Sequence, residues 1–112
     1  MKALNASQKI LLADNVVLAD TAFSRMQGLL GRSSLAEGEG LLITHCNSIH
    51  MFFMKFPIDV VFLDKNNRIV GLVSNIPPFA LSPIFWKADK ALELPAGKIL
   101  QTKSSISDQI II

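Results

Sequence analysis

The chain has 112 residues, half of them hydrophobic, which suffices for one domain with one core and is too short for two. Eleven basic and nine acidic residues give a formal net charge of +2, and no two basic residues are adjacent, so the sequence lacks the basic run of a nucleic-acid-binding tail. The single cysteine, Cys46, excludes an internal disulfide. We therefore expect one domain over residues 1–112 and no nucleic-acid partner.

The N-terminal region shows no signal peptide pattern. Its first apolar run, Ile10–Ala13, is far shorter than the hydrophobic region of a secretory leader. No apolar run approaches the roughly 20 residues of a membrane-spanning helix. Together with the lone cysteine, which fits a reducing compartment, these features lead us to expect a cytoplasmic protein without a transmembrane segment.

Two short β-type runs, 10–12 and 16–18, flank the turn-forming dipeptide Asp14-Asn15 and predict a hairpin. A helix is predicted next, beginning after Asp20 or Thr21, whose side chains favour helix N-termini, and ending at Gly31. Its apolar residues recur at i, i+1, i+4, i+7 and i+8, as on one helix face, and they are Ala22, Phe23, Met26, Leu29 and Leu30.

The remainder of the chain is rich in β-branched and aromatic residues, which favour strands. Pro57 cannot donate to a β-ladder and is expected to separate one strand before it from another after it. The polar segment 65–68 predicts a tight turn between two strands. The expected strands after the helix are 41–44, one before Pro57, 58–63, 69–73, 90–94 and 108–112, with a helical turn over 98–103.

These elements predict an α+β fold in a single compact domain. Mostly antiparallel short strands would form a barrel-like or sandwich-like arrangement, with one packed helix near the N-terminus.

Three candidate zinc ligands lie close together: His45, Cys46 and His50. A structural zinc site takes four ligands, and on a regular strand His45 points away from the face shared by the other two. Cys46 and His50 would lie about 13 Å apart on such a strand, which is too far for a nucleophile and its base. The ordinary interpretation is a buried thiol beside two imidazoles, so we expect no metal and no cofactor.

Lys55, Asp59 and Asp64 surround the most apolar part of the chain. Lys55 and Asp59 share a strand face if Pro57 leaves the alternation intact. An ion pair is the ordinary outcome, and the functional alternative is a polar anchor at the mouth of an apolar pocket.

The irregular stretch 76–87 contains three prolines and three aromatic residues. Within it, Phe85 and Trp86 precede Lys87. An exposed pair of this kind is typical of an anchor for a protein partner, a peptide or a membrane interface. The alternative is a loop that folds back as a lid on the core.

Three blocks of the sequence resemble the family called domain of unknown function 192. The first runs through 19–21, 28–32 and 38–42, the central block is SIHMFFMKFPIDVVFLD at 48–64, and the third is ALELPAG at 91–97. The resemblance implies a compact, mostly β domain with a packed helix and no established activity. If the family has a common site, it implies the matched polar positions Arg25, His50, Lys55, Asp59 and Asp64.

The leading hypothesis is a non-enzymatic binding or accessory module that holds a small molecule or a protein partner between the helix and the central strands. The alternative is a small hydrolase or metal-dependent enzyme using His50, Cys46 and Asp59. A third hypothesis is an interaction protein whose exposed strand edges pair with another chain.

Overall fold

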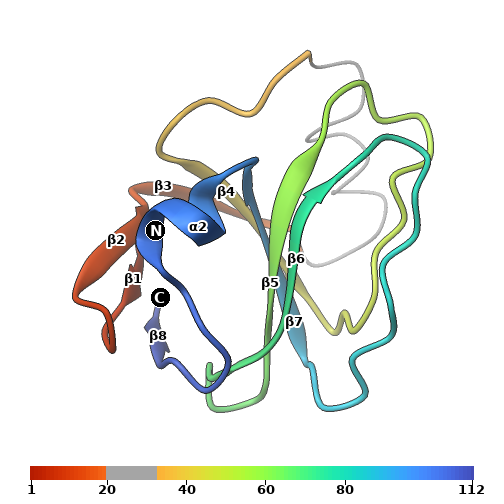
Figure 1. Cartoon of the computed structure of the whole chain (residues 1–112). Helices are drawn as coiled ribbons and strands as arrows, with labels where there is room; N and C mark the ends of the chain where they lie inside the picture. Colours follow the sequence, from red (N-terminus) through yellow and green to blue (C-terminus); the bar gives the residue numbers. More distant parts are fainter. Residues whose placement is uncertain (20–32) are drawn as a thin grey trace.

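A five-stranded sheet lies at the centre of the molecule in a computed structural model that describes residues 1–19 and 33–112 (Figure 1). β3 and β4 run parallel, and every other neighbouring pair is antiparallel. In spatial order the strands are β3 (Asn15–Ala19), β4 (Glu39–Thr44), β7 (Lys90–Pro95), β5 (Ile58–Leu63) and β6 (Ile69–Ile76).

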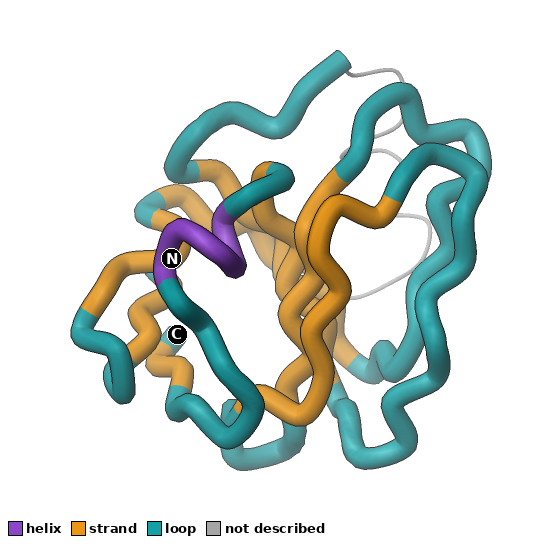
Figure 2. The backbone as a smooth tube through the Cα atoms, viewed as in Figure 1, coloured by secondary structure: helices purple, strands orange, loops and turns teal. Residues whose placement is uncertain are grey.

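A smaller, three-stranded sheet joins the two ends of the chain. β1 (Ala3–Asn5) pairs with β2 (Ile10–Ala13) on one side and with β8 (Ile110–Ile111) on the other. The short helix α2 (Lys98–Thr102) lies beside this sheet, and both termini lie close to it (Figures 1 and 2).

Successive side chains of a strand point to opposite faces of its sheet. In the central sheet both faces are covered by other parts of the chain. All six residues of β5 are buried. The face toward the small sheet and α2 forms a helix-side core, which includes Leu12, Val61, Leu92 and Ile99. The other face forms a loop-side core, in which the sheet meets residues of two long loops; it includes Ile49, Met51, Met54, Phe56, Val60 and Phe62.

The β5–β6 hairpin confirms the turn predicted over 65–68. One side-chain oxygen of Asp64 accepts hydrogen bonds from the backbone N–H groups of Asn66 and Arg68, both at 2.9 Å. This local pattern closes the turn. The strands predicted at 41–44, 58–63 and 90–94 and the helical turn at 98–103 are also present within a residue or two.

The hairpin predicted around Asp14-Asn15 is wrong. β2 and β3 exist but belong to different sheets. The backbone N–H groups of Asp14 and Asn15 both donate to the carbonyl oxygen of Gly38 at 3.0 Å. This long-range contact turns the chain so that β3 pairs in parallel with β4 instead of folding back on β2.

Two other expectations need correction. The segment before Pro57 is not a strand but part of a loop, with an isolated bridge between His50 and Leu81. The strands described in residues 1–19 and 33–112 form two open sheets and no closed barrel.

The mostly β character of a single compact domain is confirmed. The helix predicted between Asp20 and Gly31 lies outside the described residues, and the helix that is described, α2, lies near the C-terminus. No helix in the described part of the chain is long and apolar enough to cross a membrane.

Candidate binding surface

Two loops run side by side along one side of the molecule. The first loop, residues 45–57, connects β4 to β5, and the second loop, residues 77–89, connects β6 to β7 (Figure 1). Their backbones are joined at several points by N–H···O hydrogen bonds of 2.7–3.0 Å; the donor–acceptor pairs are Met51–Ala80, Phe79–Met51, Ser82–Ile49, Phe85–Asn47 and Cys46–Asp89. The loops therefore support each other as a strand pair does.

The first loop divides its side chains between the core and the solvent. Met51 and Met54 are buried in the loop-side core. The two residues between them, Phe52 and Phe53, are both exposed. The backbone of Phe53 has φ 65°, in the left-handed region that bulky residues seldom adopt. This turn of the backbone lets two consecutive phenylalanines face outward.

The second loop repeats this arrangement opposite the first. Phe79 is exposed and has φ 67°. Its ring meets that of Phe53 edge to face, with centroids 6.0 Å apart. The next ring contact joins the imidazole of His50 and the ring of Phe52, which stack at 5.1 Å. Two strained aromatic residues thus meet at the surface, and such strain is found most often at functional sites.

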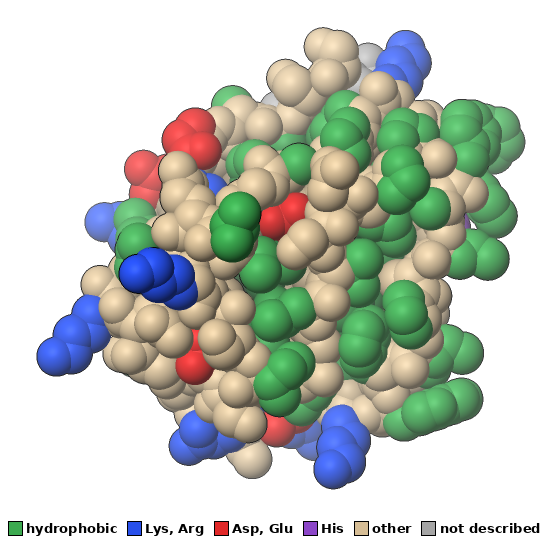
Figure 3. All heavy atoms as spheres, in the orientation of Figure 1, with side chains coloured by type: hydrophobic (Ala, Val, Ile, Leu, Met, Phe, Trp, Pro, Cys, Tyr) green, Lys and Arg blue, Asp and Glu red, His purple; other side chains and the backbone are tan. Residues whose placement is uncertain are grey.

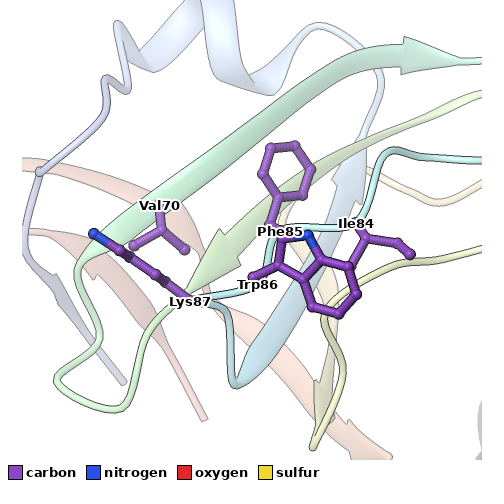
Figure 4. A pocket seen from close by; sticks show the side chains of 5 residues that line it. All are labelled: Val70, Ile84, Phe85, Trp86 and Lys87. Atoms are coloured by element: carbon purple, nitrogen blue, oxygen red, sulfur yellow. The ribbon is translucent and has the colours of Figure 1, made fainter.

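Phe85 fastens the second loop to the sheet. Its ring packs against Phe62 of β5, with centroids 4.6 Å apart. It also fills the space over Gly71 of β6, where an added Cβ atom would overlap the ring. Phe85 therefore points inward, and its neighbours Ile84 and Trp86 are left on the outer side of the loop (Figure 4).

The exposed apolar side chains of the two loops form a surface that we call the apolar ridge. Every exposed phenylalanine and tryptophan among the described residues belongs to it. Phe53 is 70% exposed and Trp86 is 80% exposed. In the space-filling view, hydrophobic side chains gather along this side of the molecule (Figure 3). The ridge consists of Phe52, Phe53, Phe79, Leu81, Ile84 and Trp86.

A groove of about 310 Å³ opens at the Trp86 end of the ridge. Val70 of β6 forms one wall, and Ile84, Phe85 and Trp86 form the others. Lys87 also lines the groove, so that an apolar cavity has an amino group at its margin (Figure 4). An apolar group with an attached negative charge would match this lining.

Asp59, predicted as a ligand anchor, lies on the other face of the sheet. Its side chain is fully buried. One carboxylate oxygen accepts from the N–H of Ile99 at 2.8 Å, and the other accepts from the N–H of Asn75 at 2.7 Å. Because Ile99 belongs to the first turn of α2, Asp59 supplies the side-chain acceptor that a helix N-terminus requires. The residue has a structural role in these contacts.

The other predicted polar residues are spread over the molecule. Asp64 closes the β5–β6 turn. Lys55 and His50 are exposed on the first loop. Arg25 lies outside the described residues. Only His50 and Lys55 therefore lie on the same loop as part of the apolar ridge.

The residues of the alternative enzyme site are not brought together. Cys46 packs against the loop-side core and donates its thiol to the carbonyl oxygen of Ser48 at 3.0 Å. Asp59 faces the helix-side core, and His50 faces the solvent. Across residues 1–19 and 33–112, no three His, Cys, Asp or Glu side chains gather as metal ligands would.

A cluster of polar side chains joins the two ends of the chain, and the sequence does not predict it. Asp108 accepts from the side chains of Asn5 and Gln8 and from the N–H of Ser105, at 2.9–3.1 Å. Burial alone would raise the pKa of Asp108, but these three hydrogen bonds outweigh burial and lower the pKa below its ordinary value of 3.8. A lone Asp near the C-terminus gives no sequence signal of such partners.

Four of the six residues of the apolar ridge are not predicted from the sequence. Phe52 and Phe53 were assigned to a strand, where alternation would bury one of them. Leu81 and Ile84 are single apolar residues among prolines and serine. The available signal was the proline content of the second loop, which already excluded a regular strand.

The family model for DUF192, described as "Uncharacterized ACR, COG1430", matches residues 3–112. A relative from Thermococcus sibiricus, named only as a UPF0127 protein, is 32% identical over 111 residues, covering 96% of this chain and 71% of the relative. These matches extend over nearly the whole chain, including both loops.

Two solved structures share the fold. A protein of unknown function from Novosphingobium aromaticivorans superposes with a TM-score of 0.82 at 19% identity, over 99% of this chain and 82% of that chain. A Sinorhizobium meliloti protein, whose description as a transcription regulator is provisional, has a TM-score of 0.82 at 25% identity, over 98% of this chain and 89% of that chain.

Proposed function

This chain belongs to the DUF192 family, whose description assigns no activity, and we propose that it is a non-enzymatic binding module whose binding surface is the apolar ridge. The observation that carries the proposal is the exposure of four aromatic side chains on two mutually supported loops. A cytoplasmic location, which fits the single Cys46, is part of the same proposal.

The energetics favour a binding role for the ridge. Exposing large apolar side chains costs about 25 cal/mol for each Å² that is left in water. Phe53 and Phe79 add backbone strain, of the order of 1–2 kcal/mol per residue in the left-handed region. Neither the exposed side chains nor the strained backbone stabilises the isolated domain. Contiguous exposed apolar patches usually mark interaction sites.

The loops are also built to hold the ridge in one arrangement. Met51 and Met54 are anchored in the core, Phe85 is fixed over Gly71, and backbone hydrogen bonds join the two loops. A surface that is ordered before binding loses less entropy when a partner arrives. The ridge therefore has the exposure and the rigidity expected of a binding surface.

Trp86 allows a direct test, because it is the only tryptophan in the sequence. We expect dodecyl maltoside, an uncharged amphiphile, to shift the Trp86 emission to shorter wavelength in a saturable way as the indole leaves water. The double variant Phe53→Ser, Phe79→Ser should weaken this response several-fold.

The matched control is Leu100→Ser. Leu100 is 83% exposed but lies on α2, on the other side of the central sheet. It should leave the titration unchanged. An emission spectrum that does not respond to the amphiphile, or a response that Leu100→Ser weakens as much as the ridge variant does, would overturn the proposal.

The description of the Sinorhizobium meliloti relative suggests nucleic-acid binding as a second candidate. The observation in its favour is that exposed aromatic rings next to lysine can stack on unpaired bases. The same Trp86 titration with a single-stranded oligonucleotide tests it, and quenching that falls steeply with added salt is the expected result.

A further inference from the structure

We propose that the occupant of the apolar ridge is the surface of a lipid bilayer that carries anionic head groups. This inference rests on the proposed function and names the partner of the same surface. It follows from the backbone pairing of the loops, the charges around the ridge and the kinds of side chain that the ridge presents.

The backbone pairing disfavours an extended peptide as the occupant. A peptide that adds to a sheet edge needs free backbone donors and acceptors. Along the ridge, the N–H groups of Met51, Phe79 and Ser82 are already bonded to the facing loop. The ridge therefore offers side chains to its partner, and its main stabilisation comes from burying them.

The exposed charges of the two loops are positive. The loops contain two exposed lysines, Lys55 and Lys87, and one acidic residue, Asp89, whose partly buried carboxylate lies 3.8 Å from the amino group of Lys90. Lys55 follows Phe53 by two positions, and Lys87 follows Trp86 directly. Both lysines are exposed. An apolar surface with cationic margins complements a surface that is apolar inside and anionic outside, as such a bilayer is.

The side-chain types favour lipid over a protein partner. A protein interface carries about one hydrogen bond per 100–200 Å². The ridge presents phenylalanine, leucine and isoleucine, and the polar groups at its surface are the indole N–H of Trp86 and the imidazole of His50, which stacks on Phe52. Tryptophan is enriched where a membrane meets water, because its ring is apolar and its N–H is polar.

The groove beside Trp86 adds a place for a single lipid chain. Ile84 and Val70 provide apolar walls, and Lys87 stands at the margin, where a phosphate would lie. Its aliphatic stem can pack against the walls while the amino group reaches the head group. The ridge and the groove together match both parts of an anionic lipid.

The test measures binding to two kinds of vesicle. One contains phosphatidylcholine alone, and the other contains 30% phosphatidylserine. Binding is followed by co-sedimentation and by the emission of Trp86. We expect saturable binding to the phosphatidylserine vesicles with a blue shift, and much weaker binding to the neutral vesicles, with a strong decrease as salt is raised.

Three variants locate the interaction. Phe53→Ser, Phe79→Ser should abolish binding to both vesicles. Lys55→Gln, Lys87→Gln should weaken binding to the anionic vesicles about 30-fold, since each lysine near an anionic surface contributes about fivefold. The control, Lys2→Gln, Lys103→Gln, changes two exposed lysines beside the small sheet and α2, on the other side of the central sheet, and should retain nearly full affinity. Circular dichroism confirms that each variant is folded.

The outcomes separate the inference from the proposed function. Amphiphile binding at the ridge without vesicle binding would overturn the membrane inference and leave the binding surface intact. Failure of both would overturn both. If Phe53→Ser, Phe79→Ser leaves vesicle binding unchanged, the membrane contact lies on another surface and the inference is overturned. Binding of the single-stranded oligonucleotide without binding of vesicles would also overturn it.

Discussion

Replacing Asp59 by alanine should destabilise the protein more than any other single polar substitution in the β5–β6 region. The carboxylate is fully buried and accepts two backbone N–H bonds, from Ile99 and Asn75. Each hydrogen bond to a charged group contributes about 1.5–3 kcal/mol, and its loss leaves a donor unpaired. We expect Asp59→Ala to lower the free energy of unfolding by about 4 kcal/mol.

The expected loss is large but measurable. A chain of this length typically has about 6–17 kcal/mol of stability, so the variant should still fold. At a slope of about 1.5 kcal/mol per molar urea, the unfolding midpoint should fall by about 2.7 M. Asp59→Asn keeps one acceptor oxygen and should show about half of this loss. Urea unfolding followed by circular dichroism provides the measurement.

Asp64→Ala is the matched control for this reasoning. Asp64 also accepts two backbone N–H bonds, but it lies in an exposed turn. When its carboxylate is removed, water can accept hydrogen bonds from the two N–H groups instead. We expect a loss of about 1 kcal/mol. Equal losses for Asp59→Ala and Asp64→Ala would refute the argument from burial. A folded Asp59 variant that fails to bind vesicles would instead indicate a functional role for Asp59.

Two further predictions follow from the loops and from the chain ends. Phe53→Gly should be about 0.5–1 kcal/mol more stable in thermal unfolding than Phe53→Ala, because φ is positive there; the reverse order would mean that this backbone conformation is not strained. The pKa of Asp108 is lowered in the folded state, so its contribution is fully present above about pH 4, near the pKa of an unfolded aspartate, and is lost as the pH falls through the lower folded value. The difference in unfolding free energy between the native sequence and Asp108→Asn should therefore be constant from pH 5 to 8 and shrink below about pH 4, and a difference that grows in acid would contradict the assignment.

Local sequence signals predicted the elements that local contacts determine. The turn after β5 was predictable because Asp64 bonds to amides only two and four positions away. The β2–β3 hairpin could not be rejected from sequence, because its failure depends on the carbonyl of Gly38, which lies more than 20 residues later. Parallel pairing of β3 with β4 has the same long-range origin.

The candidate site was only partly predictable, for a similar reason. The proline and aromatic content of the second loop indicated either a binding surface or a lid on the core. In the structure, one of two neighbouring aromatic residues fits the lid and the other fits the binding surface. Phe85 folds back on the sheet and Trp86 projects from it. Gly71, which admits Phe85, lies in another element, so the sequence of the loop alone could not divide these roles. The strand predicted before Pro57 assumed that successive side chains alternate between buried and exposed. The positive φ of Phe53 breaks this alternation, so Phe52 and Phe53 are both exposed.

The small sheet has a consequence for the order of folding. In it, Leu4 lies opposite Ile111, so that one strand pair closes a loop containing nearly the whole chain. Closing so long a loop costs more entropy than forming the β5–β6 hairpin, which spans a few residues. The five-stranded sheet should therefore form first, and the pairing of β1 with β8 should complete it. In a circular permutant whose original ends are joined and whose chain is opened at the turn after Asp64, the pairing of β1 with β8 would become a local contact.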